Sequence, residues 1–289
     1  MSIRVITDSS CDLPQRILEE YDIGMAPLHI LIDEHNYVDG IEISHEEYVD
    51  GIEISHEEYY RKCAVANGLP KTSQPSPGDI LNLIQESLKE YKHVLSVNLS
   101  SVLSGTYQTV NMVKNSIGEA VTTFDTLNGS IGVGMVVMRA CELVRKGLAI
   151  PEIIQELTAY RESLDVLVYL ETLENAVKGG RVSKVQYFAA SMLNVKPVVF
   201  IDKEDGFVKV KEKIRGEKKA LRYLINSIKE KNIDYSDRVI GVTHADCLER
   251  ANEFISMLKE EINPKEILLH SMGPVIGTYA GAGAVYVCF

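Results

Sequence analysis

The sequence feature that most constrains the fold is an apolar strand, a hydroxyl-rich turn and an amphipathic helix that follow one another without a break. His93–Asn98 is an apolar run typical of a buried strand. After the turn, Val110 and Val113 recur at the spacing of one helical face. This order is the building unit of a parallel α/β sheet, in which ligands bind at the carboxyl ends of the strands. We therefore expect an α/β fold with a candidate site at this turn.

The turn, Leu99–Gln108, is rich in neutral hydrogen-bond donors and contains no Lys or Arg. Its hydroxyl groups include those of Ser100, Ser101, Ser104 and Thr106. Gly105 relaxes the backbone, and the free amides at the start of a helix favour an anion. The turn therefore suits a carboxylate or a phosphate that is held without a formal counter-charge. The alternative is a serine-capped helix after a polar turn, which this stretch on its own favours.

The same alternation of strands and helices continues along the chain and predicts two α/β domains. A chain of 289 residues is long enough for two domains, each with its own core. We expect an N-terminal domain of residues 1–163 with a mainly parallel sheet and the hydroxyl-rich loops. Residues 164–289 then form a C-terminal α/β domain, whose first strand is Val166–Leu170.

Composition excludes several classes of partner. The chain has 30 Lys and Arg against 41 Asp and Glu, which gives a net charge of −11. An acidic chain without a basic run is a poor candidate for binding nucleic acid, and its membrane contact is transient at most. No apolar run reaches the ~18 residues of a membrane span. Strand-like sequence begins almost at the N-terminus, which leaves no room for a signal peptide.

The five cysteines are scattered and form no Cys-x-x-Cys pair. They are Cys11, Cys63, Cys141, Cys247 and Cys288. This pattern indicates a reducing compartment and argues against a disulfide framework or a structural zinc site. Since the histidines are also isolated, we expect no metal site and a cytoplasmic protein.

A tandem repeat interrupts the N-terminal half, because Val38–Tyr48 recurs unchanged as Val49–Tyr59. Structural repeats drift and need several copies to stack, so one identical copy indicates a recent duplication or an artefact of the sequence. Ser55 and Glu58 predict a capping box at a helix start. Both copies cannot occupy the same place, so we expect a bulged or poorly ordered insertion around residues 38–50.

Three other stretches have the composition of ligand-binding loops. Gly68–Pro77 contains several prolines, which lower the entropic cost of ordering a loop that also carries the hydroxyls of Thr72 and Ser73. Ser271–Gly283 is rich in glycine, which lets the backbone approach a ligand closely. Lys178–Arg181 is a tight cationic turn. Each stretch is also compatible with an ordinary surface connection.

Three patterns leave other activities open. Gly132 and Gly134 suggest a dinucleotide-binding loop, but the third glycine is missing and the neighbouring Met and Val residues indicate packing. His244 and Cys247 could form a Cys/His site, although such residues at a strand end are more often structural. Ser104 as a nucleophile lacks the Gly-x-Ser-x-Gly elbow. A hydrolase that uses Ser104 or Cys247 is therefore the less favoured alternative to a binding protein.

Six short stretches, which follow one another along nearly the whole chain, together point to a known family. They are Thr7–Pro14, Thr72–Ser76, Ser100–Gln108, Lys178–Arg181, Lys196–Pro197 and Gly273–Gly277. Taken together, they make the chain resemble the DegV family of bacterial fatty-acid-binding proteins. The resemblance implies two α/β domains with one long-chain fatty acid buried between them. It also implies a role as the lipid-carrying subunit of fatty acid kinase, whose separate ATP-binding subunit phosphorylates the carboxylate.

Carried over by position, the resemblance implies a set of site residues. The carboxylate donors are Thr72 and one of Ser101 and Ser104, with Ser104 as the first choice. The rest of the ligand-binding set comprises Ser73, Gly105, Gly277, Thr278 and Tyr279. Arg181 lies near the head group and faces the kinase subunit or the incoming phosphate. The C-terminal domain covers the acyl chain, and the resemblance implies no cofactor besides the fatty acid and no catalytic residue in this chain.

One position departs from the family pattern. The family often has Thr-His-x-Gly after Gly-Pro-Val-Ile-Gly, and Tyr279 takes the place of the histidine here. A tyrosine can hydrogen-bond a carboxylate, but it supplies no cation near neutral pH because its ordinary pKa is about 10. Fatty acid binding is still expected, whereas the departure weakens the case for phosphoryl transfer. The alternative is a lipid carrier or sensor without an enzymatic partner.

Overall fold

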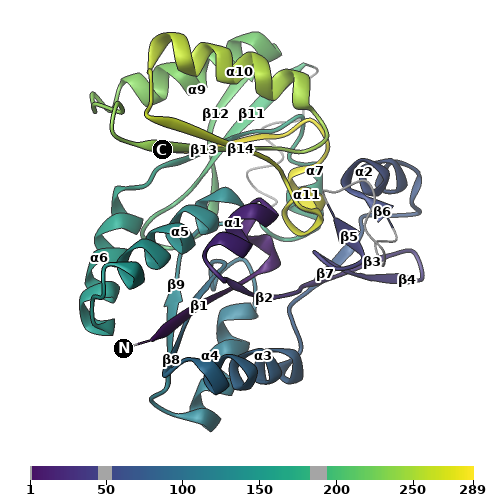
Figure 1. The fold of residues 1–289 in the computed structure, drawn as a ribbon. Coiled ribbons are helices and arrows are strands. Elements are labelled where there is room, and N and C mark those ends of the chain that lie inside the picture. Colours follow the sequence, from purple (N-terminus) through teal and green to yellow (C-terminus); the bar gives the residue numbers. More distant parts are fainter. Residues whose placement is uncertain (1, 45–53, 183–193) are drawn as a thin grey trace.

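The first of two main sheets is four-stranded and entirely parallel. A computed structural model describes residues 2–44, 54–182 and 194–289 (Figure 1). The strands of this sheet, in the order β2-β1-β8-β9, are Gly24–Ala26, Ile3–Asp8, His93–Asn98 and Val121–Asp125. Each neighbouring pair is parallel. The expected α/β class and the mainly parallel first sheet are therefore confirmed.

The second main sheet is six-stranded and mixed. Its strands, in the order β12-β11-β10-β15-β13-β14, are Val208–Arg215, Val195–Ile201, Val166–Tyr169, Val285–Cys288, Val239–His244 and Glu266–Ser271. Only β13 and β14 run parallel, and the other described pairs are antiparallel. Strands β11 and β12 form the hairpin that Asp205-Gly206 predicts, and Gly206 has the positive φ of 71° that such a turn favours.

Helices and sheets alternate as layers in the view of Figure 1. Helices α3 and α4 cover the outer face of the first sheet, α5 and α6 lie between the sheets, and α9 and α10 cover the outer face of the second sheet. In the same order, these helices are Pro77–Glu90, Thr106–Ile117, Ile131–Arg145, Ile150–Ser163, Glu217–Lys229 and Leu248–Glu261. The sequence predicts helices over Asp79–Tyr91, from the Asn128–Gly134 stretch to Val144, and from Pro151 to about Ser163, and α3, α5 and α6 confirm them.

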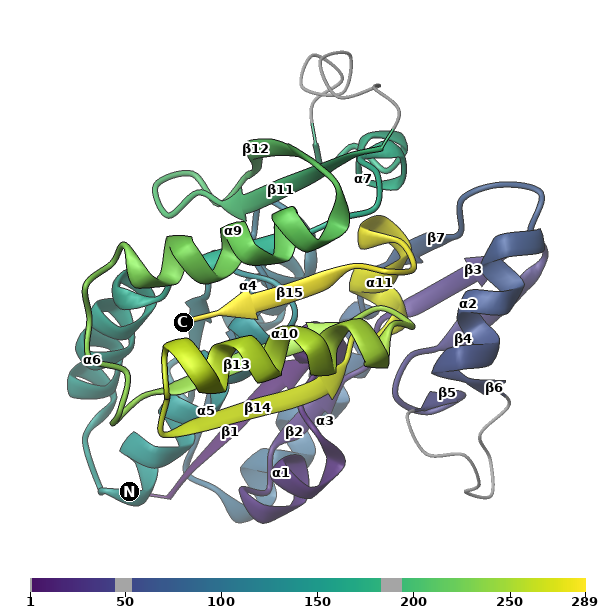
Figure 2. The same ribbon diagram turned by 90° about the horizontal axis from the view of Figure 1, so that it is seen from above.

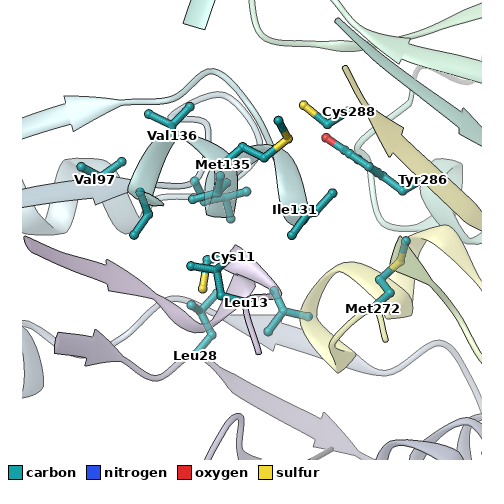
Figure 3. Close-up of a cluster of buried hydrophobic side chains, with 14 of the residues drawn as sticks. Cys11, Leu13, Leu28, Val97, Ile131, Met135, Val136, Met272, Tyr286 and Cys288 are labelled. Carbon is teal, nitrogen blue, oxygen red and sulfur yellow. The ribbon is translucent and has the colours of Figure 1, made fainter. Parts of the chain in front are cut away.

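Helix α5 is shared by the two sheets, so one core cluster spans both of them, while each sheet also has a cluster of its own on its outer face. The helix contacts β1 and β8 of the first sheet as well as β13 and β15 of the second. In Figure 3, Ile131 and Met135 of α5 lie between Leu13 and Tyr286, which come from opposite ends of the chain. This cluster is continuous through both sheets, because α5 is apolar on nearly all sides. The predicted boundary at residues 163 and 164 remains a prediction.

A small lobe stands beside the two sheets on the right of Figure 1. Its strands are β3, β4, β5, β6 and β7, namely His29–Ile32, His35–Val38, Ile43–Ser44, Ile54–Ser55 and Lys71–Ser73. Its helix α2 spans His56–Val65. The sequence predicts one strand over Met25–Ile32, but the structure divides it into β2 and β3, since Pro27 has no amide to continue the ladder.

The other described elements are short. They are η1 (Ser9–Cys11), α1 (Gln15–Glu20), α7 (Glu174–Lys178) and α11 (Pro274–Ala280). Figure 2 shows α11 beside α7 and next to the strands of the small lobe. Helix α11 contacts α7, α2, β3, β7 and η1, so it joins segments that are far apart in the sequence.

The two copies of the tandem repeat pair with each other. Ile43 of the first copy lies opposite the equivalent Ile54 of the second in the parallel pair β5–β6, and both side chains are buried. The first copy also supplies the buried Asp39, so the expected bulge is wrong for residues 38–44. Residues 45–53, which include the rest of that prediction, lie outside the described residues.

The second copy supplies the start of α2. Ser55 Oγ accepts a hydrogen bond from Glu58 N over 3.2 Å, so Ser55 is the N-cap of α2 and this half of the predicted capping box is confirmed.

Two local predictions have other outcomes. The sequence Asp12-Leu13-Pro14 predicts a helix start with Asp12 as its N-cap. Asp12 is not the N-cap of α1, because Pro14 occupies that position and the Asp12 carboxyl group is bonded elsewhere. The sequence also predicts an apolar helix over Val185–Leu193, which lies outside the described residues. In the parts of the chain that the structure describes, no helix is both long and apolar enough to cross a bilayer.

Candidate functional site

A cavity of about 340 Å³ lies where the first sheet, the second sheet and the small lobe meet. This volume falls in the range of ~300–1,000 Å³ that is typical of small-molecule sites. Much of its wall is aliphatic and comes from both main sheets and α11, including Leu99, Val168, Leu170, Val199, Ile201 and Ile276. Because β10 and β11 present one buried face to this space, the cavity is an apolar slot between the sheets.

The polar residues of the cavity come from three segments that the sequence keeps far apart. They are Thr72, Ser73 and Gln74 of the β7 region, Ser104 and Gly105 of the β8–α4 turn, and Tyr279 of α11. Thr72 Oγ1 and the Tyr279 hydroxyl lie 2.8 Å apart and share a hydrogen bond. The structure thus brings together the hydroxyl of Thr72 and the residue that departs from the family pattern.

The turn that opens α4 is shaped by a contact between Gly105 and Gln74. A Cβ at Gly105 would overlap the Gln74 side chain, whose Nε2 donates to Thr109 Oγ1 over 2.5 Å. Gly105 has an ordinary φ of −75°, so a close approach, rather than a left-handed turn, requires the glycine. This contact joins the Thr72 loop to the Ser104 turn.

Ser104 lines the cavity, and its hydroxyl pairs with a neighbour on its own turn. Ser104 Oγ lies 2.9 Å from Thr106 Oγ1 and accepts a weaker hydrogen bond from Thr106 N over 3.3 Å. Thr106 is fully buried and begins α4. The Ser104 hydroxyl can therefore form a further hydrogen bond with a ligand, and it is not paired with a base.

Arg181 lies against the Tyr279 ring at the edge of the cavity. The Arg181 Cζ atom is 4.1 Å from the centroid of this ring, which is a cation–π distance. Arg181 Nε donates to Leu103 O over 3.3 Å, and its Nη1 donates to Gly179 O over 2.7 Å. A Cβ at Gly179 would overlap the Tyr279 ring, so this glycine makes room for the stack.

A second cleft of about 390 Å³ adjoins the cavity. The two share Leu103, Ser104, Gly105 and Arg181, and the cleft adds Ser101 and Phe207. Among the described residues that line either space, Arg181 carries the only formal charge. A carboxylate in the cavity would therefore meet neutral donors first and one guanidinium at the boundary with the cleft.

Three of the predicted ligand-binding residues do not line the cavity. Ser101 lies in the adjoining cleft, where its amide donates to Asp125 Oδ1 over 3.2 Å. Gly277 faces the Tyr60 side chain, whose hydroxyl fills the space that a Cβ would need. Thr278 is buried and bonded to the Tyr59 hydroxyl over 2.5 Å. The expectation for Gly277 and Thr278 is wrong in placement, because α11 turns these residues toward α2.

Sequence reasoning missed the residues that hold α11 and the loops in position. Tyr60 donates to Met272 O over 3.1 Å, and burial raises its pKa well above the ordinary value, so it remains a donor. Gln74 belongs to one of the stretches that carry the family resemblance, yet its role depends on a contact with Gly105. No periodicity in the sequence could reveal such contacts between distant segments.

The alternative catalytic sites find no support in the described geometry. Burial raises the pKa of the Cys247 thiol to about 11, which disfavours the thiolate nucleophile. His244 Nδ1 lies 3.3 Å from the backbone amide of Cys247, and the thiol itself is bonded to Ala284 O. A Cβ at Gly134 would meet Cys11 O and Leu13, so this glycine serves packing and not a phosphate loop. Among the described residues, no group of three or more His, Cys, Asp and Glu is arranged to hold a metal.

Comparison with known proteins agrees with this geometry. A model of the DegV family matches residues 2–289. A DegV domain-containing protein of Caldanaerobacter subterraneus is 31% identical over 288 residues, which cover 99% of this chain and 98% of the relative. A fatty-acid-binding DegV family protein of Thermus thermophilus is 30% identical, with a TM-score of 0.89 over 100% of this chain and 99% of its own.

A more distant structure shares the fold alone. The fatty acid kinase B3 protein of Streptococcus pneumoniae, solved with linoleic acid, is 21% identical, with a TM-score of 0.82 over 100% of this chain and 99% of its own. The match of the family model over nearly the whole chain, together with the cavity between the two sheets, shows that this protein belongs to the DegV family.

Proposed function

We propose that this chain binds one long-chain fatty acid in the cavity between its two main sheets. The observation that carries the proposal is an aliphatic slot that ends in uncharged hydroxyl donors. The Thermus thermophilus relative, which has the same fold at 30% identity, binds fatty acid, and this supports the proposal. In this view, residues 1–163 supply the hydroxyl-rich loops and residues 164–289 supply the cover over the acyl chain.

The carboxylate is held by neutral donors in this proposal. The hydroxyls of Thr72 and Tyr279, which bond each other, can each turn to donate to a ligand oxygen, and Ser104 lines the same space. Ser73 and Gly105 complete the polar wall. Neutral donors satisfy a buried carboxylate without an ion pair that would oppose its conversion to an acyl phosphate.

A preformed slot is what makes such binding strong. Burying an acyl chain of ~14 methylenes contributes roughly 11 kcal/mol at about 0.8 kcal/mol per methylene. Lost motion on association takes back an estimated ~4–15 kcal/mol. A cavity that is already formed in the ligand-free protein leaves little further ordering to oppose binding.

The finer proposal is that this chain presents the carboxylate to an ATP-dependent kinase subunit in the cytoplasm. It is supported by the resemblance in sequence and by the cleft that adjoins the cavity at Ser104 and Arg181. The stacked guanidinium of Arg181 could meet an incoming phosphate there. Tyr279, which stands where the family often has histidine, favours the alternative of a lipid carrier or sensor without this partner.

The first test is the identity of the bound molecule. Organic extracts of the purified protein, analysed by mass spectrometry, are expected to contain about one equivalent of a fatty acid. Delipidated protein is then expected to take palmitate from neutral liposomes. As a negative control, Val199→Asp places a charge on the apolar wall of the cavity and is expected to abolish uptake. Absence of fatty acid from the extract together with no uptake from liposomes would contradict the proposal.

The second test separates the kinase subunit from the lipid carrier. The fatty-acid-loaded protein is mixed with ATP and an ATP-binding fatty acid kinase subunit, and acyl phosphate is trapped with hydroxylamine. Acyl hydroxamate formation supports presentation to a kinase. Arg181→Gln is the informative variant, since it keeps a polar chain at the boundary but removes the charge. Binding without any acyl phosphate favours the carrier.

A further inference from the structure

Helix α11 forms one wall of the cavity, yet its first turn is held by a residue from the other end of the chain. The amide of Gly273, which precedes α11, donates to Asp12 Oδ1 over 2.9 Å. The amide of Gly273 is one of the amides at the helix start that have no partner within the helix, and Asp12 supplies the accepting oxygen from a distant segment. This bond joins the start of α11 to a carboxyl group that precedes α1.

The second oxygen of Asp12 ties α11 to the helix between the sheets. Ser130, the residue before α5, donates from its hydroxyl to Asp12 Oδ2 over 2.5 Å. The same hydroxyl lies 2.8 Å from Thr243 Oγ1 of β13. Asp12, Ser130 and Thr243 are all buried, so water does not replace these bonds when one is lost. One carboxylate thus connects the N-terminal segment, α5 and the second sheet.

The surroundings of Asp12 oppose its ionisation, and its backbone conformation is strained. Burial raises its pKa to about 8, and the carboxyl groups of Asp8 and Asp39 act in the same direction. Its backbone has a left-handed φ of 48°. A buried carboxyl group without a cationic partner among the described residues contributes little net stability. The bonds of Asp12 to Gly273 and Ser130 therefore point to a role in positioning the starts of α11 and α5.

We propose that Asp12 is a positioning residue for the fatty acid head group. By fixing the first turn of α11, it keeps the Tyr279 hydroxyl 2.8 Å from Thr72 at the polar side of the cavity. Tyr279 is near the far end of this short helix, so a small tilt at Gly273 moves the tyrosine away from Thr72. This inference rests on the proposed function, because it assumes that Tyr279 meets the ligand carboxylate.

Binding measurements on paired ligands test the proposal. Asp12→Asn keeps the side-chain shape but puts an amide where an oxygen accepts from Ser130 or Gly273. We expect it to weaken palmitate binding at least about threefold and to weaken hexadecanol binding less. Its effect should be smaller in the background of Tyr279→Phe than in the wild type. Equal losses for both ligands, or independent effects of the two substitutions, would contradict the proposal.

Matched variants separate positioning from simple destabilisation. Asp39→Asn changes another buried carboxyl of the same cluster, which bonds Ser9 and the Gly40 amide, and is expected to leave palmitate affinity unchanged. Ser130→Ala removes one of the two donors to Asp12 and provides the same test if Asp12→Asn does not fold. A loss of affinity in Asp39→Asn as large as in Asp12→Asn counts against a specific role.

Hydrogen exchange of the ligand-free protein provides a readout that does not depend on lipid. Asp12→Asn and Ser130→Ala should speed exchange of the α11 amides, while Asp39→Asn should not. Unaltered exchange in α11 would contradict the positioning role of Asp12 but not the proposed function. A wild-type protein that binds no palmitate contradicts the proposed function, and with it the head-group role.

Discussion

At the scale of single residues, the site depends on how closely separate segments approach one another. Thr72 and Tyr279 share a hydrogen bond across 207 positions of sequence. Tyr279 in turn lies under Arg181 and against Gly179. These contacts form one chain of neighbours along the polar side of the cavity, so a change at any of them alters that side of the cavity.

The hydroxyls of Thr72 and Tyr279 should each contribute to affinity for a fatty acid. A hydrogen bond to a charged group contributes ~1.5–3 kcal/mol, so Thr72→Val or Tyr279→Phe is expected to weaken palmitate binding roughly 10- to 100-fold. Isothermal titration of delipidated protein measures this. Tyr223→Phe on the outer helix α9 serves as the control and should bind as the wild type does. Unchanged affinity in both site variants would show that the carboxylate lies elsewhere.

Gly179 should matter because it makes room for Tyr279. Gly179→Ala places a Cβ in overlap with the Tyr279 ring, so the ring must shift away from Thr72. We expect a loss of palmitate affinity, measured by how much palmitate is needed to displace a fluorescently labelled fatty acid. Gly68→Ala is the matched control, since open space surrounds a Cβ there. An equal affinity for Gly179→Ala and Gly68→Ala would contradict the packing argument.

At the scale of elements, the tandem repeat divides its two copies between different places in the fold. The first copy continues from β4 with the buried Asp39, and the second copy starts α2 with the Ser55 cap. Since Ile43 and Ile54 lie opposite each other in β5–β6, equivalent positions of the two copies are neighbours in space. Removing one copy therefore requires only a short rejoining of the backbone.

A chain without residues 44–54 should fold and bind fatty acid. This deletion joins Ile43 to Ser55 and restores a single copy of the segment, leaving the start of α2 intact. The loss of one buried isoleucine costs roughly 2–3 kcal/mol. Urea unfolding and palmitate titration check the two outcomes. The matched control is Ile43→Ala in the full chain, which loses a buried side chain without the deletion. An insoluble product, or one that does not bind, would show that the fold needs both copies.

At the scale of the whole molecule, a buried histidine of the small lobe, His56, contacts the second sheet next to the half-buried His270. His56 of α2 lies 3.0 Å from Ser271 Oγ of β14, and His270 is the preceding residue of that strand. Burial lowers the pKa of His56 to about 3 and that of His270 to about 4. Both side chains are therefore neutral in the folded protein at ordinary pH.

Acid should weaken this junction. The unfolded chain takes up protons on these histidines below their ordinary pKa of about 6.5, whereas the folded protein does not, so their contribution to stability falls as pH drops from 6.5 toward 4. Relative to the wild type, His56→Gln should gain up to about 1.4 kcal/mol per pH unit over this range. Urea unfolding at several pH values measures the gap. His35→Gln in the exposed β3–β4 hairpin is the control, and an equal pH trend in both variants would contradict the assignment.

The local order of the chain determined much of this fold. The apolar run at His93–Asn98, the hydroxyl-rich turn and the helix after it lie where the sequence predicts them, because hydrophobic periodicity and turn chemistry act between near neighbours. The same short-range signals predict the Ser55 cap and the β11–β12 hairpin. Six short stretches also pointed to the family.

Only the tertiary structure decided which of these residues share a site. It placed Thr72, Ser104 and Tyr279 on one cavity, turned Gly277 and Thr278 toward α2, and used Asp12 to hold α11 and not to cap α1. It also joined the two sheets through one core cluster around α5. These outcomes depend on the packing of side chains from distant segments, which periodicity along one segment does not encode.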